Sequence, residues 1–187
     1  MSAVQGFAAP VASPAFLSYP AAMLSINNGT ISLYVFKEGL LSAMGHDLRL
    51  SVREFRIEAD EERVTATFRT DSIRVEGAMR DGRLDDGALS PKQKREVLDN
   101  IADKVLQSRK FPEIVFKGRR QGMKVIGDLT MVARTNAVEL TVANIGGRFK
   151  GRVEIQPLRW GIQPYSALFG ALKIQDRVAV EFDIPDA

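Results

Sequence analysis

His46 and Asp47 are the neighbouring side chains with the clearest chemical potential in this sequence of 187 residues. A carboxylate beside an imidazole can orient a general base, or the pair can bind the polar head of a ligand. The alternative is structural: Gly45-His46-Asp47 shapes a bend into a strand, and Asp47 accepts backbone N–H bonds. We favour the structural role, keep head-group contact by His46 as the second interpretation, and place catalysis third.

The histidine and cysteine content limits the chemistry that any site can perform. His46 is the only histidine, and the sequence contains no cysteine. These counts exclude a multi-histidine or thiolate metal centre, a disulfide and a cysteine nucleophile. Carboxylates alone are a weak set of ligands for a transition metal. We therefore expect no catalytic residue, no metal site and no cofactor.

Overall composition excludes two further classes of protein. The sequence has 26 Lys and Arg residues against 23 Asp and Glu residues, so its net charge is only +3 and nucleic-acid binding is not indicated. Hydrophobic residues make up 45% of the chain, which is typical of a globular domain with a real core. No uninterrupted apolar run approaches the ~20 residues that span a bilayer, so we do not expect an integral membrane protein.

Residues 1–22 differ in composition from the rest of the chain and are rich in Ala, Pro and Ser. Three prolines interrupt every apolar stretch and the first basic residue is Lys37, so the segment does not resemble a secretory signal. We expect a flexible N-terminal tail, a domain over residues 23–187 and a cytoplasmic location. The apolar side chains Phe7 and Phe16 predict that part of the tail packs on the domain.

Period-two alternation of apolar and polar residues dominates the chain from residue 29 onward. In a strand this pattern puts the apolar side chains on one face. Since buried parallel strands are apolar on both faces, the pattern predicts an all-β, antiparallel sheet. The alternation marks about nine segments, at residues 31–36, 48–53, 64–69, 73–75, 114–116, 129–131, 138–142, 153–155 and 178–184.

One α-helix is predicted, over about residues 90–106. Ser90 with Gln93 three residues later is typical of a capping box, and Pro91 suits the first helical position. Apolar residues then repeat at helical spacing from 97 to 106 and form one stripe. We expect the helix to lie in a long connection and to pack over an opening or a face of the sheet.

A sheet of this many antiparallel strands has to hide its edges, and closure into a barrel does so. Pairs such as Asp81-Gly82 and Gln121-Gly122 supply the turns between strands. We therefore predict an antiparallel, eight-stranded β-barrel. Its interior is either filled by side chains or holds one small ligand, and the alternating residues make it apolar in both cases.

Four stretches of the sequence resemble the YceI-like family, a lipocalin-related group of extended β-barrels. They are similar to the family's GHD hairpin, its FPxIxF strand, its VxGxLT strand and its closing segment, and they occur in the family's order. The resemblance runs from about residue 23 to the C-terminus. The four stretches are residues 39–48, 108–116, 125–131 and 159–178.

The resemblance implies binding rather than catalysis. Characterised members of the family hold a long isoprenoid, such as a polyprenyl quinone precursor, inside the barrel, and they are often dimeric. We therefore expect a carrier or storage protein for an isoprenoid or a related lipid, such as a fatty acid or amide, and a homodimer is an open alternative to a monomer. Many members are exported, so a periplasmic location is the alternative to a cytoplasmic one. The chain departs from the family's usual HGVTRP at residues 132–137.

The ligand-binding residues we predict are inward-facing strand residues, His46 and three aromatic residues of the closing loop. The aromatic residues either plug one barrel end or line the ligand entrance. Two other functions stay open: an interaction module with a solidly packed barrel, and a small enzyme that uses His46 and Asp47. The predicted residues are Leu33, Val35, His46, Leu50, Val52, Phe68, Phe116, Leu129, Leu140, Trp160, Tyr165 and Phe169.

Overall fold

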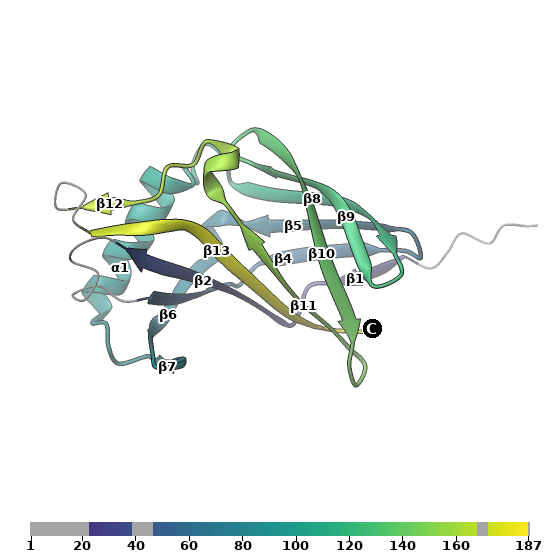
Figure 1. The fold of residues 1–187 in the computed structure, drawn as a ribbon, viewed down its shortest axis with the longest axis horizontal. Coiled ribbons are helices and arrows are strands. Elements are labelled where there is room, and N and C mark those ends of the chain that lie inside the picture. Colours follow the sequence, from purple (N-terminus) through teal and green to yellow (C-terminus); the bar gives the residue numbers. More distant parts are fainter. Residues whose placement is uncertain (1–22, 39–46, 168–171, 187) are drawn as a thin grey trace, which may run out of the picture.

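The computed structural model describes residues 23–38, 47–167 and 172–186, which form a curled antiparallel sheet with one α-helix (Figure 1). The predicted all-β antiparallel class is confirmed. The predicted tail, residues 1–22, lies outside the described part, and the domain boundary at residue 23 stays a prediction. The strands are β1 (Leu24–Ile26), β2 (Thr30–Glu38), β3 (Asp47–Val52), β4 (Phe55–Ala59), β5 (Arg63–Arg69), β6 (Ile73–Arg80), β7 (Arg83–Asp85), β8 (Glu113–Gln121), β9 (Lys124–Met131), β10 (Arg134–Asn144), β11 (Arg148–Ile155), β12 (Ser166–Ala167) and β13 (Leu172–Pro185).

The predicted count of eight strands is lower than the 13 strands of the sheet. The difference has a physical cause, because three long stretches of strand are each interrupted by a bend. Asn27-Asn28-Gly29 separates β1 from β2, Arg53-Glu54 separates β3 from β4, and the 3-10 turn Thr70–Ser72 separates β5 from β6. Strands β7 and β12 are short additions at the margin of the sheet. Counted through the three bends, the remaining strands form eight long ones.

The sheet closes on itself through these bent strands. Hydrogen-bonded neighbours follow the order β1-β4-β5-β8-β9-β10-β11-β13-β2-β3-β6-β7, and every pair is antiparallel. Strand β1, at the beginning of this order, continues along the chain into β2, near its end. In the same way β3, near the end of the order, continues into β4, near its beginning. The bent strands therefore connect the two ends of the order. Closure leaves few free edges to pair with other chains.

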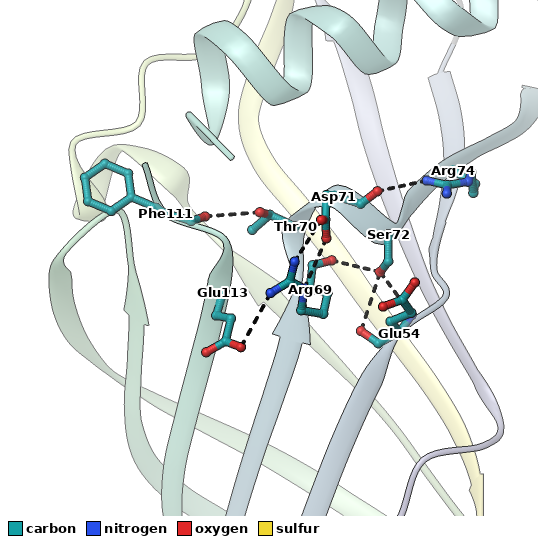
Figure 2. A network of polar contacts seen from close by, with 8 residues as sticks. All are labelled: Glu54, Arg69, Thr70, Asp71, Ser72, Arg74, Phe111 and Glu113. Carbon is teal, nitrogen blue, oxygen red and sulfur yellow. Dashed lines mark hydrogen bonds and ion pairs between the residues drawn. The ribbon is translucent and has the colours of Figure 1, made fainter. Parts of the chain in front are cut away.

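A network of polar contacts holds the bend between β5 and β6 (Figure 2). Thr70 is tied to the segment before β8: its backbone N–H donates to Pro112 O at 2.9 Å and its hydroxyl to Phe111 O at 3.1 Å. The buried Ser72 hydroxyl donates to Arg69 O at 2.8 Å and accepts the Glu54 N–H at 3.0 Å. At a bend, backbone N–H and C=O groups lose their hydrogen-bond partners on the neighbouring strand. These contacts supply new partners, since a buried backbone group without a hydrogen bond is costly.

Helix α1 (Pro91–Asn100) begins as the sequence predicts. Ser90 accepts the Gln93 N–H, and the Gln93 side chain accepts the Ser90 N–H at 2.9 Å, which confirms the capping box. The helix continues as a π-helical turn, Ile101–Val105, within the predicted length. It lies at the end of the barrel where β12 lies, opposite the turn between β10 and β11 (Figure 1). Across the described residues we find no helix with the length and hydropathy needed to cross a bilayer.

The turn between β9 and β10 has an unusual backbone. Val132 and Ala133 have φ values of 43° and 60°, a region that glycine and asparagine normally occupy. Predicted turn glycines such as Gly82 and Gly122 adopt positive φ as well, at 74° and 64°. The departure from the family's HGVTRP segment therefore falls on a turn where a side chain with a Cβ is strained.

Candidate ligand-binding site

The barrel encloses a cavity of about 630 Å³. Protein interiors are close-packed and seldom hold voids much larger than a water molecule. Pockets for small ligands have volumes of roughly 300–1,000 Å³. The lumen is therefore not filled by side chains, and its volume is that of a ligand pocket.

The cavity wall is almost entirely apolar, because the alternation of each long strand directs its apolar residues inward. Val125 and Met131, six residues apart on β9, both line the cavity, which gives it a length of about 20 Å at ~3.3 Å per residue. The strand residues of the wall include Ile31, Leu33, Val35, Val52, Ile57, Val64, Ala66, Phe68, Ile114, Phe116, Val125, Leu129, Met131, Val138, Leu140, Val142, Phe149, Val153, Ile155, Val178, Val180, Phe182 and Ile184.

We define the helix end of the cavity by Thr70, Ile101, Val105, Leu106 and Ile162, which line it beside the π-helical turn. Each of these residues is buried or half-buried. The π-helical turn thus packs over one opening of the barrel, as the apolar stripe of the predicted helix indicated. Among the described residues, this end thus has none of the largely exposed side chains that line the opposite end.

The turn end of the cavity is defined by Asp60, Arg120, Met123 and Asn144, which lie at the turns that follow β4, β8 and β10. Here the lining residues reach solvent: Arg120 and Asn144 are exposed, and Met123 keeps 65% of its surface. The backbone N–H groups of Arg63 and Glu62 donate to Asp60 and hold the pKa of its carboxyl below its ordinary value. The turn end therefore combines an opening with fixed charge.

Trp160 lies beside the cavity and packs in the core. It ends the 3-10 turn Pro157–Trp160, its exposed fraction is 0%, and its Nε1–H donates to Leu129 O at 2.7 Å. A buried indole needs such a partner, because an unpaired N–H in an apolar site is costly. Leu129 itself lines the cavity, so Trp160 fixes the position of the wall.

The family model of the YceI-like domain matches residues 41–185, which is most of the chain. The chain belongs to the YceI-like family. The resemblance inferred from the sequence motifs is thereby confirmed. No protein in the curated comparison matches the chain.

Solved structures show that the YceI-like fold is shared at low sequence identity. BcnA of Burkholderia cenocepacia is 16% identical, with a TM-score of 0.55 over 83% of this chain and 94% of that chain. A polyisoprenoid binding domain from Saccharophagus degradans, implicated in plant cell wall breakdown, is 9% identical. Its TM-score is 0.57 over 87% of this chain and 97% of that chain. At these identities the likeness establishes a common fold.

The YceI-like barrel brings most of the predicted site residues together. Two others, Leu50 and Trp160, are buried but do not line the cavity, so the structure assigns them to packing rather than to the wall. Tyr165 is half-buried and also lies off the wall, with the Lys104 Nζ 5.6 Å from its ring centre. The predicted residues on the cavity wall are Leu33, Val35, Val52, Phe68, Phe116, Leu129 and Leu140.

Asp47 has the structural role that we favoured. Its Oδ1 accepts the backbone N–H of Lys37 at 2.9 Å, which ties the start of β3 to β2. His46 and Phe169 lie outside the described residues, so the role of each stays a prediction. Within residues 23–38, 47–167 and 172–186, no three His, Cys, Asp or Glu side chains are grouped as a metal site would require.

Besides further apolar strand residues of the wall, such as Ile31 and Val125, two sets of cavity residues at its ends were not predicted as site residues. The first is Ile101 and Val105, which the π-helical turn brings over the helix end; their apolar stripe was the signal. The second is Arg120 and Asn144 at the turn end. Polar residues at strand ends look like ordinary turn residues in a sequence, and only barrel closure gathers them at one opening.

Proposed function

We propose that this YceI-like chain binds one long apolar ligand in its lumen and acts as a carrier or storage protein. The ligand class is an isoprenoid, such as a quinone precursor, or a related lipid such as a fatty acid or amide. The observation that carries the proposal is the cavity of about 630 Å³ with its apolar wall. Membership of the YceI-like family and the fold shared with a polyisoprenoid binding domain support the same ligand class.

The dimensions of the cavity define the length of the chain it would hold. A length of about 20 Å fits roughly sixteen main-chain carbons, or roughly four isoprene units, for a zigzag of bonds of about 1.5 Å. Burial of several hundred Å² at ~25 cal/mol per Å² supplies on the order of 10 kcal/mol before ordering costs. The apolar wall alone thus supports useful affinity.

The contrast between the two ends supports one orientation of the ligand. The helix end offers apolar side chains such as the half-buried Ile101 and the buried Ile162, whereas the turn end is exposed and polar at Arg120 and Asn144. A buried polar head without partners is costly, and an apolar tail is favoured in an apolar site. We therefore propose that the tail enters first through the turn end and that the polar head stays there.

Mass spectrometry of the purified protein, first native and then denaturing, tests the proposal. A bound lipid is expected as added mass that is lost on denaturation, and an organic extract should contain it. Added geranylgeraniol, a C20 prenyl alcohol, should bind to protein from which lipid has been removed. An empty extract together with no binding of farnesol or geranylgeraniol would overturn the proposal.

A matched pair of variants on β10 locates the binding site. Leu140 is half-buried on the cavity wall, whereas Ala137 is exposed and pairs across the sheet with Asp128. Leu140→Arg should abolish binding of geranylgeraniol, because a charge in the lumen loses hydration that the wall does not replace. Ala137→Arg carries the same charge outside and should bind normally. Circular dichroism establishes that both variants fold.

The cavity favours this function over an interaction module with a packed barrel. An enzyme that uses His46 and Asp47 is the other alternative, and His46→Asn separates it from a binding protein. For a binding protein, the variant should still retain lipid, whereas an enzyme should lose turnover. The cytoplasmic location and the homodimer stay predictions.

A further inference from the structure

Three positions on the inner face of the barrel carry glycine where the alternation calls for an apolar side chain. Gly118 follows the lining residue Phe116 by two positions on β8, and Gly127 follows Val125 by two positions on β9. Gly151 occupies the corresponding inner face of β11. Glycine inside a strand weakens it, so an inward glycine marks a place where another group approaches the backbone closely.

At two of the three positions the approaching group is a phenyl ring. A Cβ built on Gly118 would lie 2.6 Å from Cζ and 2.8 Å from Cε1 of Phe116. A Cβ built on Gly151 would lie 2.4 Å and 2.7 Å from the same atoms of Phe182, its cross-strand partner on β13. Each ring therefore lies against the bare backbone of a glycine, an arrangement that also protects the strand.

Gly127 serves a different purpose. A Cβ at this position would lie 2.2 Å from Lys117 O and 2.3 Å from the Cα of Gly118, so it would meet backbone and not a ring. Gly118 and Gly127 are direct partners in the β8–β9 ladder. Gly127 lets the two strands approach, whereas Gly118 and Gly151 let the rings lie flat.

The position of the two rings determines how much of the lumen stays open. Phe116 and Phe182 both line the cavity. A ring that lies along the wall leaves the axis of the barrel free, whereas a ring pushed off the wall projects into the space that a ligand chain would occupy. Because a phenyl ring is much wider across its plane than a methyl group, a ring turned away from the wall narrows the space available to a branched chain.

We propose that Gly118 and Gly151 set the width of the lumen, so that it accepts a methyl-branched isoprenoid chain and not only a straight alkyl chain. This inference rests on the proposed function, because it concerns the ligand selectivity of the same cavity. The two glycines have no side chain that could contact the ligand. Each acts through the phenylalanine beside it, Gly118 through Phe116 and Gly151 through Phe182. Gly118 is the better position for a test: its Cβ would meet ring atoms first, whereas a Cβ at Gly151 would also lie 2.6 Å from Thr141 O.

The test compares geranylgeraniol, which is methyl-branched, with straight-chain hexadecanol in displacing a fluorescent fatty-acid probe. In Gly118→Ala the added methyl displaces the Phe116 ring into the lumen. Affinity for geranylgeraniol should fall about tenfold or more, the effect of a methyl-sized misfit in a pocket, while affinity for hexadecanol changes much less. Gly118→Ala combined with Phe116→Leu should recover binding of geranylgeraniol, because the ring is gone.

Two further variants keep the test decisive. Gly87→Ala is the matched control, because a Cβ there meets only Asp85 Oδ1 at 3.7 Å, and it should behave as the wild type. If Gly118→Ala does not fold, Phe116→Leu alone should shift the preference toward geranylgeraniol, since it widens the lumen without a clash. An unchanged preference in that variant overturns the inference.

The outcomes separate this inference from the proposed function. If the wild type binds neither alcohol, the width inference fails; if its organic extract is also empty, the proposed function fails as well. If the wild type binds both and Gly118→Ala leaves their ratio unchanged, or weakens both equally, only the width inference fails. Selective loss of geranylgeraniol that Phe116→Leu repairs supports both.

Discussion

The helix end and the turn end of the cavity are built from the same eight long strands, yet they differ in how they are covered. At the helix end, Trp160 and Ile162 are buried and the π-helical turn packs over the opening. At the turn end, Met123 and Asn144 line the cavity and face solvent. The comparison indicates that tight packing is concentrated at the helix end, whereas the turn end gives access to the lumen.

The cause of the difference lies in the connections between strands. Three connections near the helix end carry their own structure: the bend Thr70–Ser72, the π-helical turn Ile101–Val105 and the 3-10 turn Pro157–Trp160. The turn end has short hairpins, as at Gly122-Met123. Longer connections can bury side chains over an opening, and short turns cannot. Substitutions at the two ends should therefore differ in their effect on stability.

The largest effect is expected from Trp160→Ala at the helix end. The substitution removes a fully buried indole and its bond to Leu129, and a Trp-to-Ala change in a core costs roughly 3–5 kcal/mol. The free energy of unfolding, measured by chemical denaturation, should fall by that amount. Leu158→Ala in the same turn and Met123→Ser at the turn end remove exposed side chains and should each cost well under 1 kcal/mol. Equal losses at both ends would contradict the comparison.

A smaller loss is expected from Ser72→Ala in the bend shown in Figure 2. The substitution leaves the Glu54 N–H without its 3.0 Å acceptor, and an unpaired buried group costs about 1–3 kcal/mol. Ser25→Ala on β1 removes an exposed hydroxyl and is the control. Denaturation midpoints of the two variants give the difference, and a cost no larger than that of the control would show that the bend needs no such bond.

Ala133→Gly should stabilise the barrel. Ala133 is exposed and has a φ of 60°, which costs a residue with a Cβ about 1–2 kcal/mol relative to glycine. The greater entropy of glycine in the unfolded chain offsets about 0.4–1 kcal/mol of this. We expect a net gain of about 0.5–1 kcal/mol, measured as a raised denaturation midpoint. A lowered midpoint would show that the turn between β9 and β10 is not strained.

The smallest effect is expected from acid at the Arg69–Asp71 pair in the same bend. Hydrogen bonds from the Arg69 guanidinium lower the pKa of the Asp71 carboxyl. A lowered pKa in the folded state gives stability that is fully present above the unfolded pKa, near pH 4, and is lost as the pH falls from there through the lower folded pKa. Asp71→Asn should therefore flatten the fall of unfolding free energy below about pH 5. Since the pair is exposed, added salt should reduce the effect, and an unchanged acid profile would contradict it.

Local patterns in the sequence predicted much of this fold. The alternation predicted the principal strands, and Ser90 with Gln93 predicted the start of the helix. Strand β4 (Phe55–Ala59) was missed: the predicted segment ends at residue 53, and the short alternation that resumes after the bend was not recognised as a strand of its own. The positive φ of Val132 was missed because β-branched residues rarely adopt it.

The sequence predicted the part of the candidate site that follows from the alternation of apolar and polar residues along the strands. Inward residues such as Val35 and Phe68 follow from the period of a strand, and both line the cavity. The separation of Leu50 and Trp160 from the wall depends on how the closed barrel packs, as the bond from Trp160 to Leu129 across 31 positions of sequence shows. Contacts of that range carry no local signal in the sequence.

The pairing of β2 with β13 has a consequence for the order of events in folding. Val35 lies opposite Val178 and Leu33 opposite Val180, so the ring closes only when strands from the two ends of the described chain meet. Contacts of such long range require the costliest loop closure and tend to form slowly. All four side chains line the cavity, so the pocket does not exist before this last seam is made. A lipid bound in the lumen would slow the separation of β2 from β13. If the turn end were blocked, the rate at which these two strands separate would limit the release of the lipid.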